Sequence, residues 1–157
     1  MKRLFFQFFL VGSLLILIYA CDKNRVFDDY KSIPENGWEK DSLVSFDFNI
    51  ARATQKHNLY LNVRNKTSYN YSNLWLFVEI TDPDGTVKKD TFEITLAEPT
   101  GKWLGEGFGG LKTRVSVFRR DVAFNKTGTY NIKIQQGMRE NNLTGISDIG
   151  FRVEKTE

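Results

Sequence analysis

The chain has 157 residues, with 22 Lys or Arg, 19 Asp or Glu and a formal charge of +3 at neutral pH. This near balance, with no cluster of basic residues, gives no basis for nucleic-acid binding. A single cysteine and a single histidine exclude a disulfide framework and leave no zinc-binding constellation.

The first twenty residues have the pattern of an export signal. Lys2 and Arg3 form a short basic region, and the run from Leu4 to Tyr19 contains no charged residue. That run is shorter than the about 20 apolar residues of a membrane-spanning helix, and it ends abruptly at Ala20. We therefore predict a signal peptide over residues 1–20.

Cys21 is predicted to carry a lipid anchor. Ile18 and Ala20 before it resemble the bacterial lipobox, although Tyr19 is larger than the residue usually found there. The thiol can take a diacylglyceryl group, and two or three acyl chains hold a protein on a membrane because each buried methylene contributes about 0.8 kcal/mol. A plain signal peptide and an uncleaved anchor are the alternatives, and the lone cysteine directly after Ala20 argues against both.

After the signal peptide the sequence predicts a tether and one domain. Residues 21–40 are polar with isolated aromatics and are expected to be a tether ending in a turn at Pro34–Gly37. Residues 41–157 have the length of one domain that buries its own core. Loss of Lys2 and Arg3 with the signal lowers the formal charge to about +1.

Apolar and polar residues alternate along much of residues 41–157, which is typical of half-buried strands. The segment Asn73–Thr81 is apolar on both faces and is predicted to be the most buried strand, central in its sheet. It is followed by a turn at Asp82–Gly85 and a returning strand over Thr86–Leu96, which together predict a hairpin. The other predicted strands are Leu43–Ile50, Leu59–Val63, Thr113–Arg119, Thr129–Gln135 and Ile149–Val153.

No segment has the apolar spacing of a helix, so the sequence does not predict alternating strands and helices. The fold class is therefore all-β, an antiparallel β-sandwich, jelly-roll-like or Ig-like, of about seven to eight strands. The strand order cannot be inferred from the sequence.

The glycine-rich segment Gly101–Gly110 contains G-x-G-x-x-G, but it lies between two predicted strands rather than opening a helix, so a dinucleotide site is not expected. We interpret it as a flexible loop that presents Trp103 and Phe108, the candidate interaction residues. These aromatics either cap the core or contact a partner, and core capping is slightly favoured.

Nothing in the sequence supports catalysis, a cofactor or a bound metal. His57 lies in a predicted turn with no Ser-His-Asp arrangement, and Asp82 and Asp84 flank a proline as turn formers do. Asp41-Ser42-Leu43 resembles a short bacterial O-glycosylation motif, which is a weak signal. A hydrolase would need two carboxylates that meet in a pocket.

Read in order, several short blocks resemble the GldH-type gliding-motility lipoproteins of the Bacteroidetes, over nearly all of the chain after Cys21. The blocks are Tyr30…Ile33-Pro34…Gly37-Trp38, Leu61-Asn62-Val63-Arg64-Asn65, Tyr69-Asn70-Tyr71-Ser72-Asn73-Leu74, Asp82-Pro83-Asp84-Gly85, Gly101-Lys102-Trp103-Leu104-Gly105-Glu106-Gly107, Gly128-Thr129-Tyr130, Gln135-Gln136-Gly137-Met138-Arg139 and Leu143…Gly145-Ile146…Asp148-Ile149-Gly150.

The resemblance implies a noncatalytic envelope lipoprotein, bound to the membrane by its lipid and needed for gliding with a protein-secretion apparatus of the outer membrane. It implies other gliding or secretion proteins as partners, no small-molecule substrate, and the periplasmic face of the outer membrane in preference to the inner membrane. The alternative is a carbohydrate-binding β-sandwich lipoprotein that uses Trp103, Phe108, Tyr69 and Tyr71.

Overall fold

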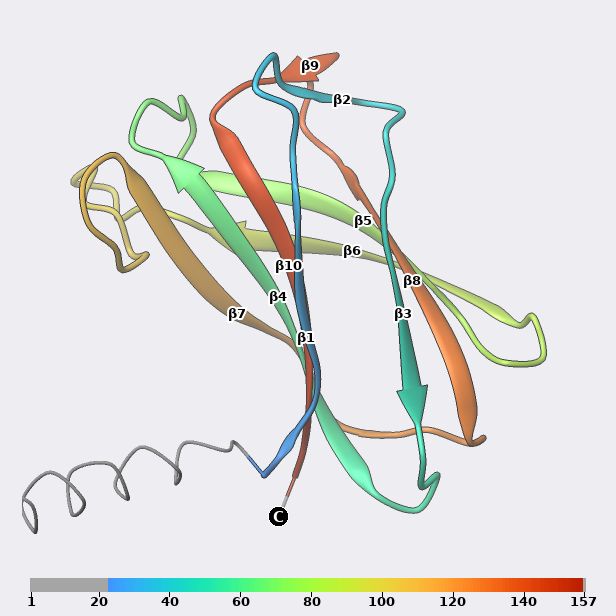
Figure 1. Ribbon diagram of the computed structural model, residues 1–157. Helices are drawn as coiled ribbons and strands as arrows, with labels where there is room; N and C mark the ends of the chain where they lie inside the picture. The colour runs from blue at the N-terminus through green and yellow to red at the C-terminus, as the bar shows by residue number, and fades with distance from the viewer. Residues whose placement is uncertain (1–22, 157) are drawn as a thin grey trace, which may run out of the picture.

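The computed structural model describes residues 23–156, and Figure 1 shows them as two packed layers of strands. One sheet has the order β1-β10-β4-β7, the other has the order β3-β8-β5-β6, and every neighbouring pair runs antiparallel. A short pair, β2-β9, lies at one end. The strands are β1 (Arg25–Ser32), β2 (Trp38–Glu39), β3 (Val44–Ile50), β4 (Lys56–Lys66), β5 (Asn73–Thr81), β6 (Val87–Thr95), β7 (Leu111–Ala123), β8 (Gly128–Gln136), β9 (Asn142–Leu143) and β10 (Ile146–Lys155). The predicted all-β sandwich is confirmed.

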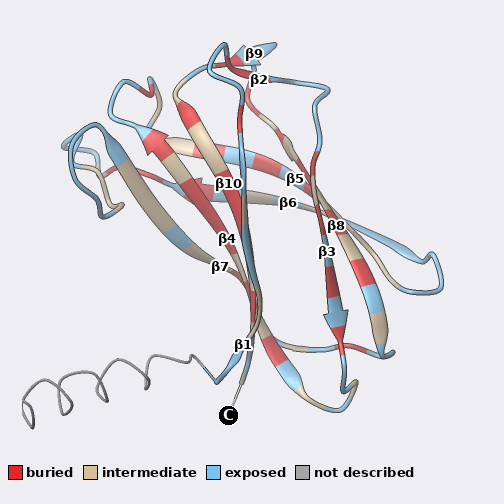
Figure 2. Ribbon diagram, viewed as in Figure 1, coloured by how far each residue is buried: buried red, intermediate tan, exposed pale blue. Residues whose placement is uncertain are grey.

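Alternation of side chains explains most of these strands. In β3, Val44, Phe46, Phe48 and Ile50 are buried, while the residues between them face outward. In β4 the predicted inward set is likewise buried. Figure 2 shows buried residues, in red, as bands along the strands of both sheets.

The core joins the two sheets through aromatic rings. Phe151 of β10 lies 5.1 Å from Phe48 and 6.4 Å from Phe46, both on β3, measured between ring centroids. Trp38 is 1% exposed at the end that carries β2 and β9, and its ring N–H donates to the Ser42 carbonyl at 2.9 Å. This satisfied indole closes that end of the sandwich.

The two predicted turns form as expected. The Gly85 N–H donates to the Asp82 carbonyl at 2.9 Å, and Gly85 has φ of 85°, which explains the glycine there. At the other turn the Gly37 N–H donates to the Pro34 carbonyl at 3.0 Å. The hairpin of β5 and β6 is therefore confirmed in both its turn and its pairing.

The prediction of a tether over residues 21–40 is wrong for most of its length. Arg25–Ser32 forms β1, paired with β10, and Phe27 packs against the core. Its polar sequence concealed the strand because β1 is at an edge of its sheet, with one neighbour and one exposed face. Residues 21 and 22 lie outside the described part of the chain.

The prediction that β5 is the most buried strand is also wrong. It is central, between β8 and β6, but Trp75 and Phe77 face outward and are 40% and 46% exposed. The more buried strands are β4 and β10 of the other sheet. The predicted strand Thr113–Arg119 lies within the longer β7, where Val115 is 52% exposed. Within residues 23–156 we find no helix with the length and apolar character needed to cross a membrane.

Candidate functional site

The outer face of the β3-β8-β5-β6 sheet carries an exposed apolar surface. Because Leu74, Leu76 and Val78 of β5 point into the core, the residues between them must point out. Trp75 and Phe77 therefore lie on the same outer face. Leu43, directly before β3, is 55% exposed. We call these three residues, Leu43, Trp75 and Phe77, the apolar platform.

Contacts with Gly137 hold the two aromatic residues of the platform in place. Phe77 lies beside Gly137, where a Cβ would be 3.3 Å from Cε2 of the ring, so the absence of a side chain makes room for the phenyl group. The Gly137 N–H donates to the Trp75 carbonyl at 2.7 Å. These contacts fix Trp75 and Phe77 on a paired, central strand rather than on a loop.

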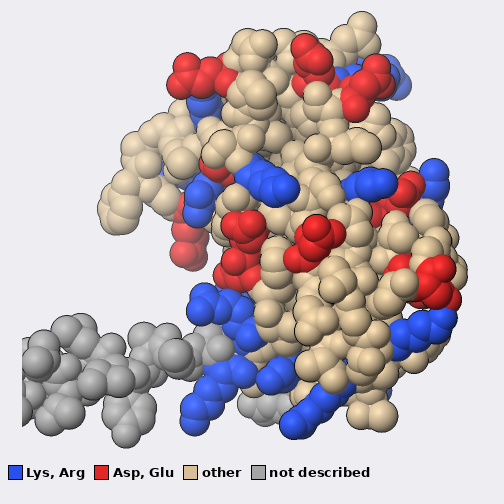
Figure 3. Space-filling view, turned by 45° about the vertical axis from the view of Figure 1, so that its right-hand side comes forward, with Lys and Arg blue, Asp and Glu red and all other residues tan. Residues whose placement is uncertain are grey.

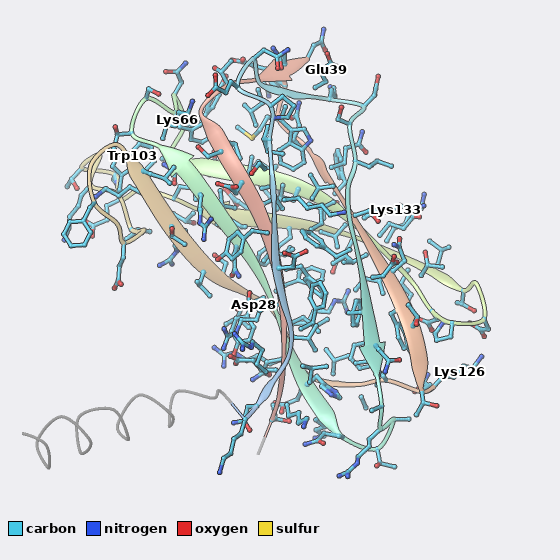
Figure 4. All side chains as sticks on the ribbon, viewed as in Figure 1. Asp28, Glu39, Lys66, Trp103, Lys126 and Lys133 are labelled. Atoms are coloured by element: carbon cyan, nitrogen blue, oxygen red, sulfur yellow. The ribbon has the colours of Figure 1, made fainter. Side chains whose placement is uncertain are left out.

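Charged residues border the platform. Glu79 of β5 lies between Lys89 of β6 and Lys133 of β8, at 3.2 Å and 3.7 Å. Figure 4 shows Lys133 directed away from the sandwich. An open hollow of about 760 Å³ follows this face, lined by Leu43, Phe77, Val78, Glu79, Lys89, Asp90, Thr91, Lys133 and Gln135. Its apolar centre with a charged border is the arrangement found in protein–protein interfaces.

The candidate interaction residues Trp103 and Phe108 have different environments. Trp103 is half-buried, packs against the core and pairs with Ala97 through the backbone, whereas Phe108 is fully exposed. Figure 4 places Trp103 and Lys133 at opposite sides of the molecule, so this loop and the apolar platform are separate surfaces. Trp103 has the environment expected of a core cap, while Phe108 keeps that of a contact residue.

The glycine-rich segment is tied to the sheet rather than open along its length. Glu106 and Thr113 exchange backbone hydrogen bonds at 3.0 Å and 2.7 Å. Gly107 has φ of 146°, and a Cβ there would lie 2.5 Å from the Leu111 carbonyl oxygen. Glycine at this position therefore permits the close return of the backbone onto β7.

The residues suggested for carbohydrate binding do not form one surface. Tyr69 is 5% exposed, and burial raises the pKa of its hydroxyl. Tyr71 meets it edge to face, with an interplanar angle of 64°, and donates a hydrogen bond to Glu140. A sugar-binding platform needs coplanar exposed rings, which this pair does not provide.

His57 and the acidic residues of the platform hollow have structural surroundings. His57 is 3% exposed beside Phe124, with ring centroids 5.4 Å apart, and burial lowers the pKa of its imidazole. In the platform hollow, Glu79 pairs with two lysines and Asp90 pairs with Arg119 at 2.5 Å. Residues 23–156 hold no group of three or more His, Cys, Asp or Glu that could bind a metal. Cys21 lies outside the described residues.

A family model for the GldH lipoproteins matches residues 25–153, which covers both sheets of the sandwich. The chain belongs to the GldH lipoprotein family. A GldH homolog from Christiangramia forsetii, described as a gliding motility lipoprotein, is 43% identical over 97% of this chain and 97% of its own length. The gliding motility lipoprotein GldH of Flavobacterium johnsoniae is 41% identical over 90% of this chain and 92% of its own.

Membership of the GldH family makes the chain a gliding-motility lipoprotein, lipid-anchored in the cell envelope. Among solved structures, the VP2 subviral particle of infectious bursal disease virus has a TM-score of 0.43 at 13% identity, over 87% of this chain and 33% of that chain.

The apolar platform was missed by sequence reasoning because its residues were assigned to the core. The signal that could have found it is the pair of bulky aromatics on the second face of a strand in an antiparallel sheet, where one face is commonly solvated.

Proposed function

We propose that this protein is a noncatalytic member of the gliding machinery, anchored through Cys21, that docks a protein of the motility-linked secretion apparatus through its apolar platform. We place it at the periplasmic face of the outer membrane. The observation that carries the proposal is the exposure of Trp75 and Phe77 on a rigid central strand. Aromatic side chains of this kind supply large contact areas with little loss of conformational entropy and are frequent in interface hot spots.

The opposite face of the sandwich supports this choice by contrast. On the outer face of the β1-β10-β4-β7 sheet, Arg152 lies between Asp28, at 2.9 Å, and Glu154. Arg64 covers the ring of Tyr30, with 4.1 Å between the guanidinium carbon and the ring centroid. The part of that face around Arg152 and Tyr30 is a paired polar layer, whereas the apolar platform leaves large hydrophobic groups in water.

The glycine-rich loop offers a second contact through Phe108. The side chain is fully exposed and makes no contribution to the core. Trp103 packs inward and holds the segment on the sandwich. We therefore expect Phe108→Ala to leave the melting temperature unchanged and to weaken partner binding. We expect Trp103→Ala to lower the stability by about 1–3 kcal/mol, as truncation of a partly buried aromatic does.

The direct test of docking is crosslinking in intact membranes followed by identification of the captured proteins. The test variant is Trp75→Ser/Phe77→Ser, and the matched control is Val115→Ser, an exposed apolar residue on the other sheet. We expect gliding or secretion proteins to be recovered with the unchanged chain and with the control, and to be lost with the test variant. Recovery of the same partners with Trp75→Ser/Phe77→Ser at unchanged melting temperature would contradict docking at the platform. A polysaccharide bound by the unchanged chain and released by this variant would favour the carbohydrate-binding alternative.

The anchor and its location are tested separately. Cys21→Ser should abolish acyl labelling and leave the precursor uncleaved, because the lipid is attached to that thiol before cleavage. Separation of inner and outer membranes by density should place the acylated protein in the outer membrane fraction. Acyl labelling that persists in Cys21→Ser, or recovery with the inner membrane, would count against the corresponding part of the proposal.

A further inference from the structure

Exposed basic side chains gather at the end of the sandwich where β1 begins and β10 ends. Figure 3 shows Lys and Arg side chains along the lower margin of the molecule, where few Asp or Glu side chains lie. Six exposed residues make up what we call the basic end: Lys23, Arg25, Arg52, Lys56, Arg120 and Lys155.

The backbone brings these residues together from four segments, residues 23–25, residues 52–56, Arg120 of β7 and Lys155 of β10, with β7 paired to β4 next to Arg120. Lys155 N–H donates to the Asn24 carbonyl at 2.8 Å, which joins the last strand to the residues before β1. Thr156 N–H donates to the Lys56 carbonyl at 3.0 Å, which joins the same strand to the start of β4. Arg52 belongs to the turn that precedes Lys56, where its carbonyl accepts from the Gln55 N–H at 3.4 Å.

Few acidic groups neutralise this end. The ion pairs found among residues 23–156 include none of the six basic side chains. Glu154, opposite Arg25 in the pairing of β1 with β10, is engaged by Arg152, and Asp121 is the exposed acidic residue beside Arg120. Among residues 23–156, the basic end therefore has an excess of positive charge, with Asp121 as its exposed acidic neighbour.

The short connection to the anchor places this end close to the bilayer. Arg25 begins β1, so only residues 22–24 separate the strand from Cys21. Four peptide steps span at most about 14 Å, against a Debye length of about 8 Å at physiological ionic strength. With Cys21 in the membrane, the basic end cannot be far from the lipid headgroups.

We propose that the basic end rests on anionic phospholipid headgroups and orients the domain on the membrane. This inference depends on the anchoring through Cys21 that is part of the proposed function. The opposite end, where Glu39 and Lys66 lie, is then directed away from the bilayer (Figure 4). The apolar platform, on the side of the sandwich, is left free for a neighbouring protein.

The test compares lysine reactivity on two membranes. The mature protein is purified in detergent, the acylation of Cys21 is checked by mass spectrometry, and the protein is reconstituted into vesicles of phosphatidylcholine alone or of an equimolar mixture with phosphatidylglycerol. A membrane-impermeant amine reagent should label Lys23, Lys56 and Lys155 about fivefold more slowly on the anionic vesicles, the factor that corresponds to about 1 kcal/mol per charge at the surface. Lys40 and Lys66 should react equally on both membranes.

Charge reversal provides the matched variants. Arg52→Glu/Lys56→Glu/Lys155→Glu should remove the protection of Lys23, while Lys40→Glu/Lys66→Glu/Arg139→Glu, three exposed residues away from the basic end, should leave it intact. High salt should likewise remove the protection. Equal labelling of Lys56 and Lys155 on both membranes, in protein whose Cys21 is acylated, would overturn this inference alone. An unacylated Cys21 would overturn both the anchoring and the inference that depends on it.

Discussion

The ring of Tyr30 in β1 lies directly over the backbone of Gly150, its partner in β10. A Cβ on Gly150 would lie 2.6 Å from Cε1 of that ring, a distance that real contacts do not reach. The ring is covered in turn by the guanidinium of Arg64. An aromatic residue opposite a strand glycine restores the packing that the glycine lacks, so this contact holds the edge strand on the sheet.

Gly150→Ala should therefore destabilise the domain by about 1–3 kcal/mol, because the added methyl group displaces Tyr30 and with it Arg64. Urea denaturation measures the loss. Gly110→Ala is the control, since a Cβ there would meet only Thr67 Oγ1 at 3.7 Å. Equal stability of Gly150→Ala and Gly110→Ala would show that β1 does not depend on this contact.

Phe27→Ala tests whether β1 belongs to the folded domain. The ring of Phe27 lies about 6 Å from those of Phe46, Phe48 and Phe151, so its removal leaves a gap over the core. We expect a loss of about 2–4 kcal/mol in the free energy of unfolding. Val87→Ala, at an exposed apolar position, should change it by less than about 0.5 kcal/mol. If residues 21–40 were a free tether, the two variants would unfold alike.

Neighbouring residues of β5 should respond in opposite ways to the same substitution. Leu76→Asp places a carboxylate at a position that is 0% exposed and should prevent folding, because the penalty of several kcal/mol approaches the total stability. Phe77→Asp places it in water and should shift the melting temperature by only a few degrees. Thermal denaturation of the two variants is the measurement. If both faces of β5 were buried, Phe77→Asp would unfold the domain as Leu76→Asp does.

Acidification should destabilise the domain through His57. Burial lowers the pKa of its imidazole below the ordinary value of 6.5, an effect that a backbone hydrogen bond with Gln55 partly opposes. Below about pH 6.5 the unfolded chain binds a proton at His57 that the folded chain does not bind. The contribution of neutral His57 to the free energy of unfolding is therefore complete above about pH 6.5 and is lost as the pH falls toward the folded-state pKa. A difference of one pKa unit is worth about 1.4 kcal/mol. His57→Leu should remove this pH dependence in urea titrations above about pH 5, below which the carboxylates titrate. An unchanged slope would mean that His57 is not the group responsible.

The sequence predicted strands wherever one face is apolar and the other polar. Thr129–Gln135 follows this rule, and the structure has β8 there with Tyr130, Ile132 and Ile134 inside. Strand β1 was not predictable in this way because Asp28, Asp29 and Lys31 interrupt the apolar pattern of an edge strand, which is held by backbone pairing with β10 together with the packing of Phe27 and Tyr30.

The candidate site could be predicted less well than the fold. Alternation reports that β5 has two apolar faces, but it does not say whether a second layer covers the outer one. Among the described residues, no other element covers Trp75 and Phe77, and their exposure in the folded structure, which local patterns do not encode, reveals this. The glycine-rich loop was easier to find because glycine and aromatic residues together are locally conspicuous, although the sequence did not separate the inward Trp103 from the outward Phe108.

The place where the chain leaves the sandwich decides how it carries mechanical load. In the proposed anchoring through Cys21, the chain runs from the lipid into β1, which among the described residues is joined to the rest of its sheet only by β10. In an antiparallel pair the hydrogen bonds run perpendicular to the strands, so a pull along β1 strains all of them at once, from Arg25 to Ser32. A sideways pull would instead break them one after another from the anchored end. With the anchor at Cys21 as proposed, the domain should resist traction best when the force runs along its strands, away from the membrane.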